Sequence, residues 1–211
     1  SKTLNLPKTN FQMRAGLPEK EPKILEEVFE KQHIYEKMLE KNKGKTPFVL
    51  HDGPPYANGE IHIGHALNKV LKDTIVRYKN LRGYWTPFIP GYDTHGMPTE
   101  KKAIQLLGLN RDEIPVNTFR DTCKKFTMDY KDKQTEGFKR LGVLGDWEHP
   151  YITYQPQMEA KQIGVFADMY KKGYIYKGLK PVYWCTDCET ALAEAEIEYK
   201  NVNSNTAYVK F

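Results

Sequence analysis

The sequence predicts an α/β protein in which helices flank a parallel β-sheet. Three observations lead to this fold class: a short apolar run at Phe48–Leu50, a strongly periodic segment at Ile63–Tyr78, and a second apolar run at Trp85–Ile89. A strand, a helix and a strand in that order form a crossover unit whose strands run in the same direction. Ligands of such sheets bind beyond the carboxyl ends of the strands, so we expect a site in the loops that follow Leu50 and Ile89.

Apolar residues at helical spacing predict the first two helices. Residues 21–42 carry apolar side chains at roughly helical spacing, and the segment ends in the lysine-rich turn 41–45. Within 63–78, the apolar residues fall on one face of a helix: Ile63, Ala66, Leu67, Val70, Leu71, Ile75 and Tyr78. This pattern is typical of an amphipathic helix.

The second half of the chain is predicted to be helical first and extended later. A helix should follow Pro98, a long helix should span 117–141, and a further helix should span 157–172 after a loop. Beyond it, aromatic and β-branched residues at 174–176 and 181–184 predict short strands. The final residues, 207–211, also read as a strand, and a chain that stops inside a strand is expected to be a truncated one.

Composition excludes several classes of protein. The chain has 211 residues, of which 39% are apolar and 28% charged, and its mean hydropathy is −0.69. No apolar run approaches the ~20 residues that a membrane helix requires, and no signal peptide opens the sequence, so we expect a cytoplasmic protein with no membrane partner. Three cysteines fit a reducing compartment. The net charge of +5 is compatible with a nucleic-acid backbone and equally with ordinary solubility.

The most informative part of the chain is the loop His51–Gly59 together with His62-Ile63-Gly64-His65. A loop rich in Gly and Pro between a strand and a helix N-terminus places backbone N–H groups and the positive end of the helix dipole around one point. That point suits a polyphosphate, and imidazoles there donate to phosphate oxygens as negative charge develops during phosphoryl or adenylyl transfer. An isolated HxxH pair is more often half of a metal site or a capped surface pair, so spacing alone leaves these alternatives open.

Several motifs together carry a family resemblance. They are His62–His65, which reads HIGH; Gly53–Gly59, which reads GPPYANG; Pro90–Pro98, which reads PGYDTHGMP; and the flanking segments Leu4–Phe11 and Gly145–Tyr151. With these motifs the chain resembles class I aminoacyl-tRNA synthetases, and among them the isoleucyl-tRNA synthetases, over nearly its whole length. Tyr92 and Met97 stand where that family has Trp and Leu, a difference near the amino-acid pocket.

The resemblance implies a domain organisation. The fold is expected to be the N-terminal half of a Rossmann-like catalytic domain, a parallel sheet with flanking helices, ending at the start of the editing insertion. Residues 1–45 are then an N-terminal extension with a helix packed on the catalytic domain, and residues 46–184 are the first half of that domain. Residues 185–211 are expected to form a CxxC zinc-knuckle segment and the start of the connective insertion that carries editing.

The resemblance also implies an ATP site. In the family, the two histidines of the HIGH motif, here His62 and His65, contact the ATP phosphates and stabilise the transition state of adenylate formation. Gly64 leaves room for the nucleotide above the helix start, and Asn58 is expected to contribute to the same site. Positioning and electrostatics of this kind carry most of the catalysis of phosphoryl-type transfers.

The amino-acid site is expected in the neighbouring loops. By resemblance, the Asp93 carboxylate and the Gly53 carbonyl bind the α-ammonium of the amino acid, and Pro54 lies against its side chain. An ammonium buried beside apolar groups requires a fixed counter-charge, which Asp93 supplies. An aspartate after Gly-Tyr is otherwise a common turn residue, and it is the motif that favours the functional role.

Cys185 and Cys188 form a CxxC pair, whose spacing allows two thiolates to bind one zinc ion. A closed structural site needs four ligands, and Cys123 lies in a predicted helix, so the pair is predicted to be half of a zinc site. Relatives of this family complete such a site with a second CxxC after the editing insertion. A vestigial pair without metal is the alternative, whereas a redox pair is disfavoured because no thioredoxin-like pattern surrounds it.

The function implied by the resemblance is ATP-dependent activation of isoleucine to isoleucyl-adenylate and its transfer to tRNA(Ile). ATP is the substrate, together with Mg²⁺, and the full-length enzyme is expected to be a monomer. The second signature of the class, a KMSKS-like lysine loop, occurs nowhere in the sequence, so the chain is expected to carry the HIGH half of the adenylation site. The competing hypotheses are a valyl- or leucyl-tRNA synthetase, a cofactor-forming nucleotidyl transferase of the same superfamily, and a non-catalytic synthetase-derived binding module.

Overall fold

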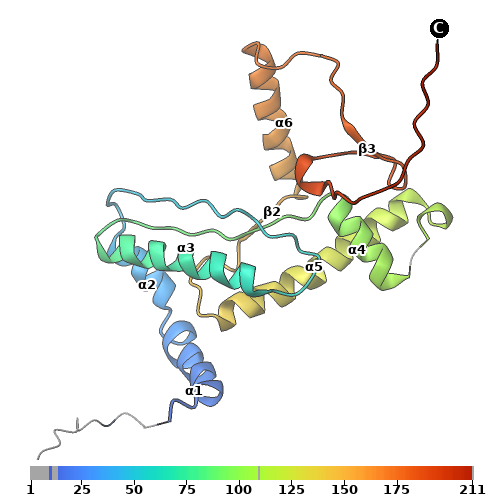
Figure 1. Cartoon of the computed structure of the whole chain (residues 1–211). Helices are drawn as coiled ribbons and strands as arrows, with labels where there is room; N and C mark the ends of the chain where they lie inside the picture. The colour runs from blue at the N-terminus through green and yellow to red at the C-terminus, as the bar shows by residue number, and fades with distance from the viewer. Residues whose placement is uncertain (1–9, 11–13, 109, 211) are drawn as a thin grey trace, which may run out of the picture. The chain divides into compact units, whose positions relative to one another are not determined.

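The computed structural model describes residue 10 and residues 14–108 and 110–210. Of the opening motif Leu4–Phe11, only Asn10 is therefore among the described residues, and Phe211 also lies outside them. The chain divides into two compact units, Ser1–Ile163 and Gly164–Phe211, whose elements Figure 1 shows in chain order.

The N-terminal helical region is interrupted where the sequence predicts one helix over 21–42. It consists of α1 (Leu17–Ile24), the π-helical η1 (Leu25–Glu30) and α2 (Ile34–Lys41). His33 has a left-handed φ of 49°, so helical geometry ends before it and α2 begins with His33 as its N-cap. The prediction of a continuous helix is wrong because apolar periodicity does not report the backbone geometry of a single residue.

The first unit contains a parallel sheet, as the sequence predicts. β1 (Gly91–Tyr92) and β2 (Tyr151–Ile152) pair in parallel. Isolated parallel bridges at Pro47 and Tyr56 join the segment 47–56 to the segment 85–93, which contains β1. The segment 85–93 therefore has two neighbours that run in its own direction, which confirms the parallel crossover predicted from the strand–helix–strand order.

The predicted strands differ from the observed ones in extent. The N–H of Phe48 donates to the carbonyl of Trp85 at 2.8 Å, as a parallel pair requires. Beyond that bond, neither Phe48–Leu50 nor Trp85–Ile89 continues as a ladder, and regular pairing occurs at β1 and β2 instead. β2 lies in a segment predicted to be a loop, because two residues are too few to show the alternation of a strand.

The longer helices agree with the sequence pattern. α3 spans Ile63–Leu81, α4 spans Met97–Leu107, α5 spans Val116–Arg140 and α6 spans Pro156–Lys171. A 3₁₀ turn, η2 (Arg111–Glu113), lies between α4 and α5. α3, α5 and α6 begin and end within a few residues of their predicted bounds, and α4 begins where a helix is predicted to follow Pro98, so these helical predictions are confirmed.

Two clusters of buried apolar residues form the core of the first unit. Their fully or nearly fully buried members come from the loop before α3, from β1 and the segment that leads into it, from α3 and α5, and from the segment after α5: Ala57, Tyr92 and Phe138 in one cluster, and Val76, Phe88 and Val143 in the other. Trp147 packs against both clusters. The same apolar contacts that form the core therefore hold together the segments in which the site is predicted.

The apolar face of α3 is mostly exposed. Ile63 is 86% exposed and Leu67 is 62% exposed, whereas the buried residues of the helix are Lys69, Val76 and Asn80. The helix thus packs on the unit through its more polar side, where hydrogen bonds and ion pairs satisfy the buried groups. Periodicity located the helix correctly but did not identify the face that this unit buries.

The second unit is built around one hairpin. β3 (Tyr183–Cys185) pairs antiparallel with β4 (Thr190–Leu192), and a 3₁₀ turn, η3 (Glu194–Glu196), follows. The register places Cys185 opposite Thr190. The hairpin confirms the strand predicted at 181–184.

The other strands predicted in this region do not form. Residues 174–176 and 207–210 have no ladder partner among the described residues. None of the residues 164–210 is buried, so there is no core against which a strand could pack. Aromatic and β-branched residues favour strands mainly through such packing. None of the helices in the described part of the chain combines the length and the apolar composition that crossing a membrane requires.

Candidate functional site

His62 begins α3 by capping its N-terminus. Its backbone is extended, with φ −124° and ψ 175°, and its Nδ1 accepts a hydrogen bond from the N–H of Gly64 at 3.1 Å. In return, the Nδ1 of His65 accepts from the N–H of His62 at 3.2 Å. The two imidazoles form a reciprocal capping box, in which they replace the usual hydroxyl and carboxyl side chains. The capped pair that HxxH spacing allows is therefore present.

These hydrogen bonds decide which nitrogen of each ring carries the proton. Because Nδ1 of both His62 and His65 accepts from a backbone N–H, the neutral form of each imidazole has its proton on Nε2. The rings are stacked, with 3.9 Å between centroids and 22° between planes. The pair therefore offers two neighbouring Nε2–H donors at a helix N-terminus, where anions are favoured.

His65 is the more enclosed of the two histidines. It is partly buried, and its ring meets the ring of Phe138 edge-on, with 6.3 Å between centroids. Burial lowers the pKa of His65 below its ordinary value of 6.5, and the nearby His62 and Lys69 lower it further. His65 is therefore neutral near pH 7, and it donates through Nε2–H without a positive charge of its own.

Gly64 is required by the stacked histidines themselves. A Cβ at this position would lie 2.9 Å from Cε1 of His62 and 3.1 Å from its Nδ1. Any larger residue would displace the His62 ring from the helix cap. This steric reason stands beside the role predicted for Gly64, which is to leave room for a nucleotide.

The loop that contains GPPYANG and the loop that carries Asp93 lie side by side. The N–H of Ala57 donates to the carbonyl of Asp93 at 2.9 Å, and the N–H of Asp93 donates to the carbonyl of Pro55 at 2.8 Å. Tyr56 and Asp93, from two motifs that are far apart in the sequence, thus form one parallel bridge. The structure brings the predicted amino-acid ligands from both motifs to the same end of the sheet.

The predicted amino-acid ligands remain accessible. Oδ1 of Asp93 accepts from the N–H of His95 and from the hydroxyl of Thr153, both at 3.4 Å, which are long and weak hydrogen bonds. The Asp93 side chain and Pro54 are partly buried, and Gly53 is exposed. The carboxylate therefore has capacity to bind a further donor.

Thr153 links the Asp93 loop to α6, and sequence reasoning assigned it no role. Its hydroxyl accepts from the N–H of Thr94 at 3.0 Å and lies 3.2 Å from Nδ1 of His95. Nε2 of His95 lies 3.1 Å from Oε1 of Glu159. Thr153 directly follows β2, so the pairing of β2 with β1 brings it next to the loop that follows β1.

Asp52 is a fully buried carboxylate that sequence reasoning also missed. Lys69 and Lys72 of α3 both contact it, Lys72 at 2.7 Å, and the N–H of Gly91 donates to its Oδ2 at 3.0 Å. The hydroxyl of Tyr151 donates to its backbone carbonyl. One residue therefore joins the binding loop to α3, β1 and β2. The available signal was an aspartate beside a glycine loop, followed by lysines three residues apart on one helix face.

The ion pair of Asp52 and Lys69 lies in the interior. Lys69 is 2% exposed, and its ammonium also lies over the ring of Phe138, 5.1 Å from the centroid. Burial lowers the pKa of Lys69, while the negative charge of Asp52 and its hydrogen bond raise it. The pair thus places two opposite charges together in a region where an unpaired charge is costly.

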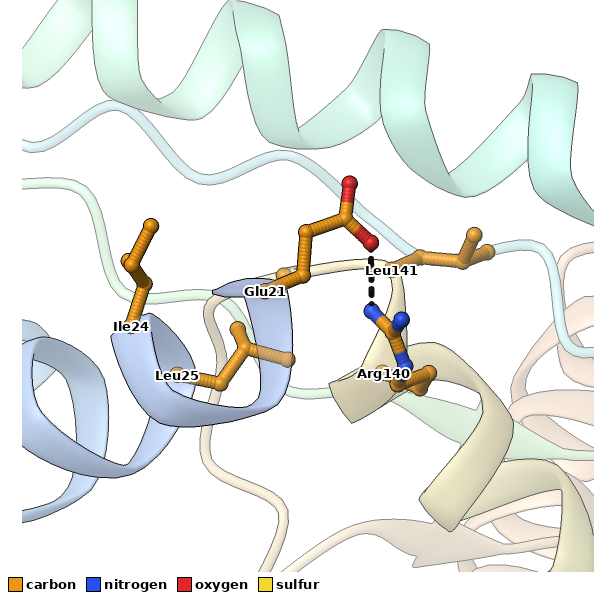
Figure 2. Close-up of a pocket in the computed structure, with 6 residues that line it drawn as sticks. Glu21, Ile24, Leu25, Arg140 and Leu141 are labelled. Carbon is orange, nitrogen blue, oxygen red and sulfur yellow. Dashed lines mark hydrogen bonds and ion pairs between the residues drawn. The ribbon is translucent and has the colours of Figure 1, made fainter. Parts of the chain in front are cut away.

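Two open cavities lie outside the predicted residues. One, of about 490 Å³, is lined by α1, η1 and the end of α5, and Figure 2 shows Glu21 and Arg140 directed toward one another there, in an ion pair of 2.8 Å. The other, of about 730 Å³, is lined by Glu60 and Ile61 and by a charged stretch of α5. The second one adjoins His62 through the chain, whereas the first is remote from it in sequence.

The predicted cysteine pair occupies one hairpin. Cys185 ends β3 and Cys188 lies in the turn before β4, and both thiols are free. Hydrogen bonds from Cys188 lower the pKa of the Cys185 thiol, which favours the thiolate that binds metal. Within 14–108 and 110–210, no group of three or more His, Cys, Asp or Glu side chains is placed to hold a metal ion. Half of a zinc site therefore stays a prediction for this pair.

The fold and the histidine pair agree with a comparison to known families. Residues 24–209 match the model of the tRNA synthetases class I (I, L, M and V). The chain belongs to this family, which confirms the class that the HIGH motif predicts.

The curated relatives narrow the class to one kind of enzyme. The isoleucine–tRNA ligase of Moorella thermoacetica is 61% identical over 211 residues, and that of Caldicellulosiruptor saccharolyticus is 60% identical over 211 residues. The isoleucine–tRNA ligase of Carboxydothermus hydrogenoformans is 60% identical over 210 residues. Each comparison covers 100% of this chain and 23% of the relative, so the chain spans less than a quarter of the length of the curated relatives it matches.

A solved structure supports the fold. The chain matches a crystal structure described as the ternary complex of an Agrobacterium radiobacter K84 LeuRS, tRNA and LeuAMS, with a TM-score of 0.65 and 24% identity. The match covers 86% of this chain and 21% of the other. At this identity the likeness concerns the fold alone, and it confirms the Rossmann-like α/β class predicted from the sequence.

Proposed function

We propose that this chain carries the HIGH half of the adenylation site of an isoleucine–tRNA ligase, which activates isoleucine with ATP and transfers it to tRNA(Ile). The observation that carries the proposal is the geometry at the start of α3. There, two stacked imidazoles present Nε2–H donors beside a loop that is hydrogen-bonded to the Asp93 backbone. Relatives at about 60% identity over the whole chain favour isoleucine over valine and leucine.

On the ATP side, His62 and His65 donate from Nε2 to phosphate oxygens, and Gly64 and Asn58 lie along the nucleotide. Attack of the isoleucine carboxylate on the α-phosphorus forms the mixed anhydride and expels pyrophosphate, which leaves with Mg²⁺. Negative charge grows on the phosphate oxygens in the transition state. Preorganised donors at a helix N-terminus stabilise that charge without reorganising during the reaction.

On the amino-acid side, the Asp93 carboxylate and the Gly53 carbonyl bind the α-ammonium, and Pro54 lies against the aliphatic side chain. The weak hydrogen bonds that Asp93 Oδ1 accepts support this role, because they hold the carboxylate in place while leaving it free to accept from an ammonium. A charged hydrogen bond of this kind is stronger than those it supplements.

The remaining parts of the prediction are proposed on the same basis. Residues 1–45 are an extension packed on the catalytic domain, 46–184 its first half, and 185–211 the zinc-knuckle segment that leads into an editing insertion. Cys185 and Cys188 would supply two thiolates to a zinc ion, whose role there is to cross-link the hairpin. The enzyme acts in the cytoplasm as a monomer.

The test is amino-acid-dependent exchange of pyrophosphate into ATP, measured with isoleucine, valine and leucine. Because the chain corresponds to about 23% of its relatives, it is assayed both alone and as a hybrid enzyme, in which it replaces the matching segment of the Moorella thermoacetica isoleucine–tRNA ligase. We expect exchange that is strongest with isoleucine and much greater in the hybrid enzyme. If exchange is strongest with valine or leucine, that amino acid would be the substrate in place of isoleucine. Absence of exchange in the hybrid with all three would favour a binding module.

A further inference from the structure

Gln134 of α5 holds the loop that precedes the HIGH motif. Its side chain is fully buried, and its Nε2 donates to the carbonyl of Tyr56 at 2.9 Å and to the carbonyl of Gly59 at 2.7 Å. These two carbonyls lie on either side of Asn58, which is proposed to contact ATP. A single amide nitrogen therefore fixes the turn to which Asn58 belongs.

The orientation of the Gln134 amide follows from its acceptors. Rotating the amide by half a turn would place Oε1 against two carbonyl oxygens, so the amino group must face the loop. Oε1 is then left buried with no hydrogen-bond partner. A buried acceptor without a donor costs free energy, so an apolar side chain would serve packing better. The benefit of Gln134 lies in its two bonds to the loop.

The next residue of α5, Thr135, holds the second loop. Its hydroxyl donates to the carbonyl of Lys131 at 2.8 Å, so the hydrogen in its 2.6 Å contact with Tyr92 comes from the tyrosine hydroxyl. Tyr92 is fully buried and immediately precedes Asp93. Thr135 therefore fixes the strand end that carries the proposed ligand of the amino-acid ammonium.

We propose that Gln134 and Thr135, termed here the α5 clamp, are positioning residues for the two sides of the substrate site. Gln134 sets the position of the Tyr56–Gly59 turn on the ATP side, and Thr135 sets the position of Asp93 on the amino-acid side. Neither residue is required to touch a substrate. The assignment of a substrate to each side rests on the proposed function, whereas the hydrogen bonds of Gln134 and Thr135 do not depend on it.

The contacts are tested by hydrogen exchange in this chain. Gln134→Met keeps the length of the side chain but removes its donor. Thr127→Val is the matched control, because Thr127 is also buried on α5 and its hydroxyl has no hydrogen-bond partner. The readout is the amide of Ala57, which donates to Asp93. We expect it to exchange about tenfold faster in Gln134→Met, as the loss of two hydrogen bonds permits. Equal exchange in Gln134→Met and the control would overturn the clamp.

Thr135→Val is the second variant. It replaces the hydroxyl with a methyl group of similar size, so the fold is expected to remain intact. It should accelerate exchange of the Thr153 amide, which donates to the carbonyl of Tyr92 at 3.1 Å. Unchanged exchange at Thr153 would remove Thr135 from the proposal. Circular dichroism of every variant establishes that the helices are intact before exchange rates are compared.

Kinetics of the hybrid enzyme then separate positioning from a merely structural role. Gln134→Met should raise the KM for ATP about tenfold with little change in the KM for isoleucine, and Thr135→Val should do the reverse. A loss of stability alone would leave both constants unchanged, or change them together, and either result overturns the assignment. If the unsubstituted hybrid shows no exchange, the proposed function fails, and hydrogen exchange alone still decides whether the clamp exists.

Discussion

Each histidine of the HIGH motif uses one ring nitrogen for the helix cap, and we propose that the other binds a ligand. Nδ1 of both His62 and His65 accepts a backbone N–H at the start of α3, which leaves Nε2–H for a ligand. Alanine removes both functions at once and so cannot distinguish them. Amides can, because the Asn oxygen lies near the position of Nδ1, whereas the Gln nitrogen lies near that of Nε2.

We expect His65→Asn to retain the helix cap and lose the donor. Adenylate formation by the hybrid enzyme should fall by about two orders of magnitude, which is typical when one transition-state donor is removed. The thermal midpoint of the chain should change little. Pyrophosphate exchange and circular dichroism measure the two effects. His65→Gln is the control, which should retain more activity at the expense of the cap, and wild-type activity in His65→Asn would contradict the catalytic role.

The lowered pKa of His65 also predicts how stability depends on pH. Burial, with help from His62 and Lys69, holds the folded pKa below the ordinary value of 6.5, so in that range the unfolded chain binds more protons than the folded chain. Stability from this group therefore rises with pH and is lost as the pH falls through 6.5. In urea denaturation, the free energy of unfolding of the wild type should fall more steeply than that of His65→Asn between about pH 7.5 and 5.5. Parallel curves would contradict the lowered pKa.

At the scale of elements, α3 is held by charges and hydrogen bonds on its polar side. Asp52 connects Lys69 and Lys72 of this helix to Gly91 and Tyr151 of the sheet. The helix that carries the HIGH motif is thereby tied to the loop before it and to the strand that leads to Asp93. Asp52 therefore adds a connection between these segments to the backbone bridge that already joins them.

Breaking that connection should destabilise the chain strongly. Asp52→Asn leaves the Lys69 ammonium buried without a counter-charge, and we expect a loss of about 3 kcal/mol in the free energy of unfolding. Urea denaturation of this chain measures it. The double variant Asp52→Asn/Lys69→Met removes the stranded charge and should recover much of the loss. Lys72→Met should cost less, because Lys72 is 15% exposed. Equal stability of Asp52→Asn and Lys72→Met would show that burial of the pair is unimportant.

At the scale of the whole molecule, the two units differ in what stabilises them. The unit Ser1–Ile163 contains both apolar clusters and the buried ion pair, whereas residues 164–210 include no buried side chain. Local opening is cheapest where few apolar contacts must be broken. The first unit should therefore open as a cooperative body, and the second should open separately.

This difference in stability between the two units predicts the order of cleavage in limited proteolysis. Trypsin should cut first at lysines of the second unit, among them Lys177 and Lys200, which are exposed and lie outside helices and strands. Mass spectrometry should then find the α3 and α5 regions intact in the surviving fragment. Digestion of the urea-unfolded chain provides the control, in which all regions are cut. Cleavage inside α3 or α5 as fast as at Lys177 would contradict the assignment of stability to the first unit.

Several parts of the fold and of the site follow from the sequence by itself. The helix α3 was predicted because its signals are local: apolar residues at helical spacing, and a glycine loop with HIGH before it. The parallel direction of the strands followed from a connection rule and needed no contact. The motif residues also sufficed to predict the family, because HIGH and GPPYANG occur together in one short stretch.

Only the tertiary structure decided how these parts meet. Gln134 donates a hydrogen bond to a carbonyl 78 residues away, and the backbone carbonyl of Asp52 accepts one from a hydroxyl 99 residues away. No sequence pattern around either residue identifies its partner. The sequence does not distinguish a polar side chain that is solvated from one that is buried and paired. The face that α3 buries was missed for the same reason, whereas β2 was missed because two residues are too few to show the alternation of a strand. Local periodicity determines which segments are helical, whereas the burial of polar groups depends on which distant donors and acceptors the fold brings to them.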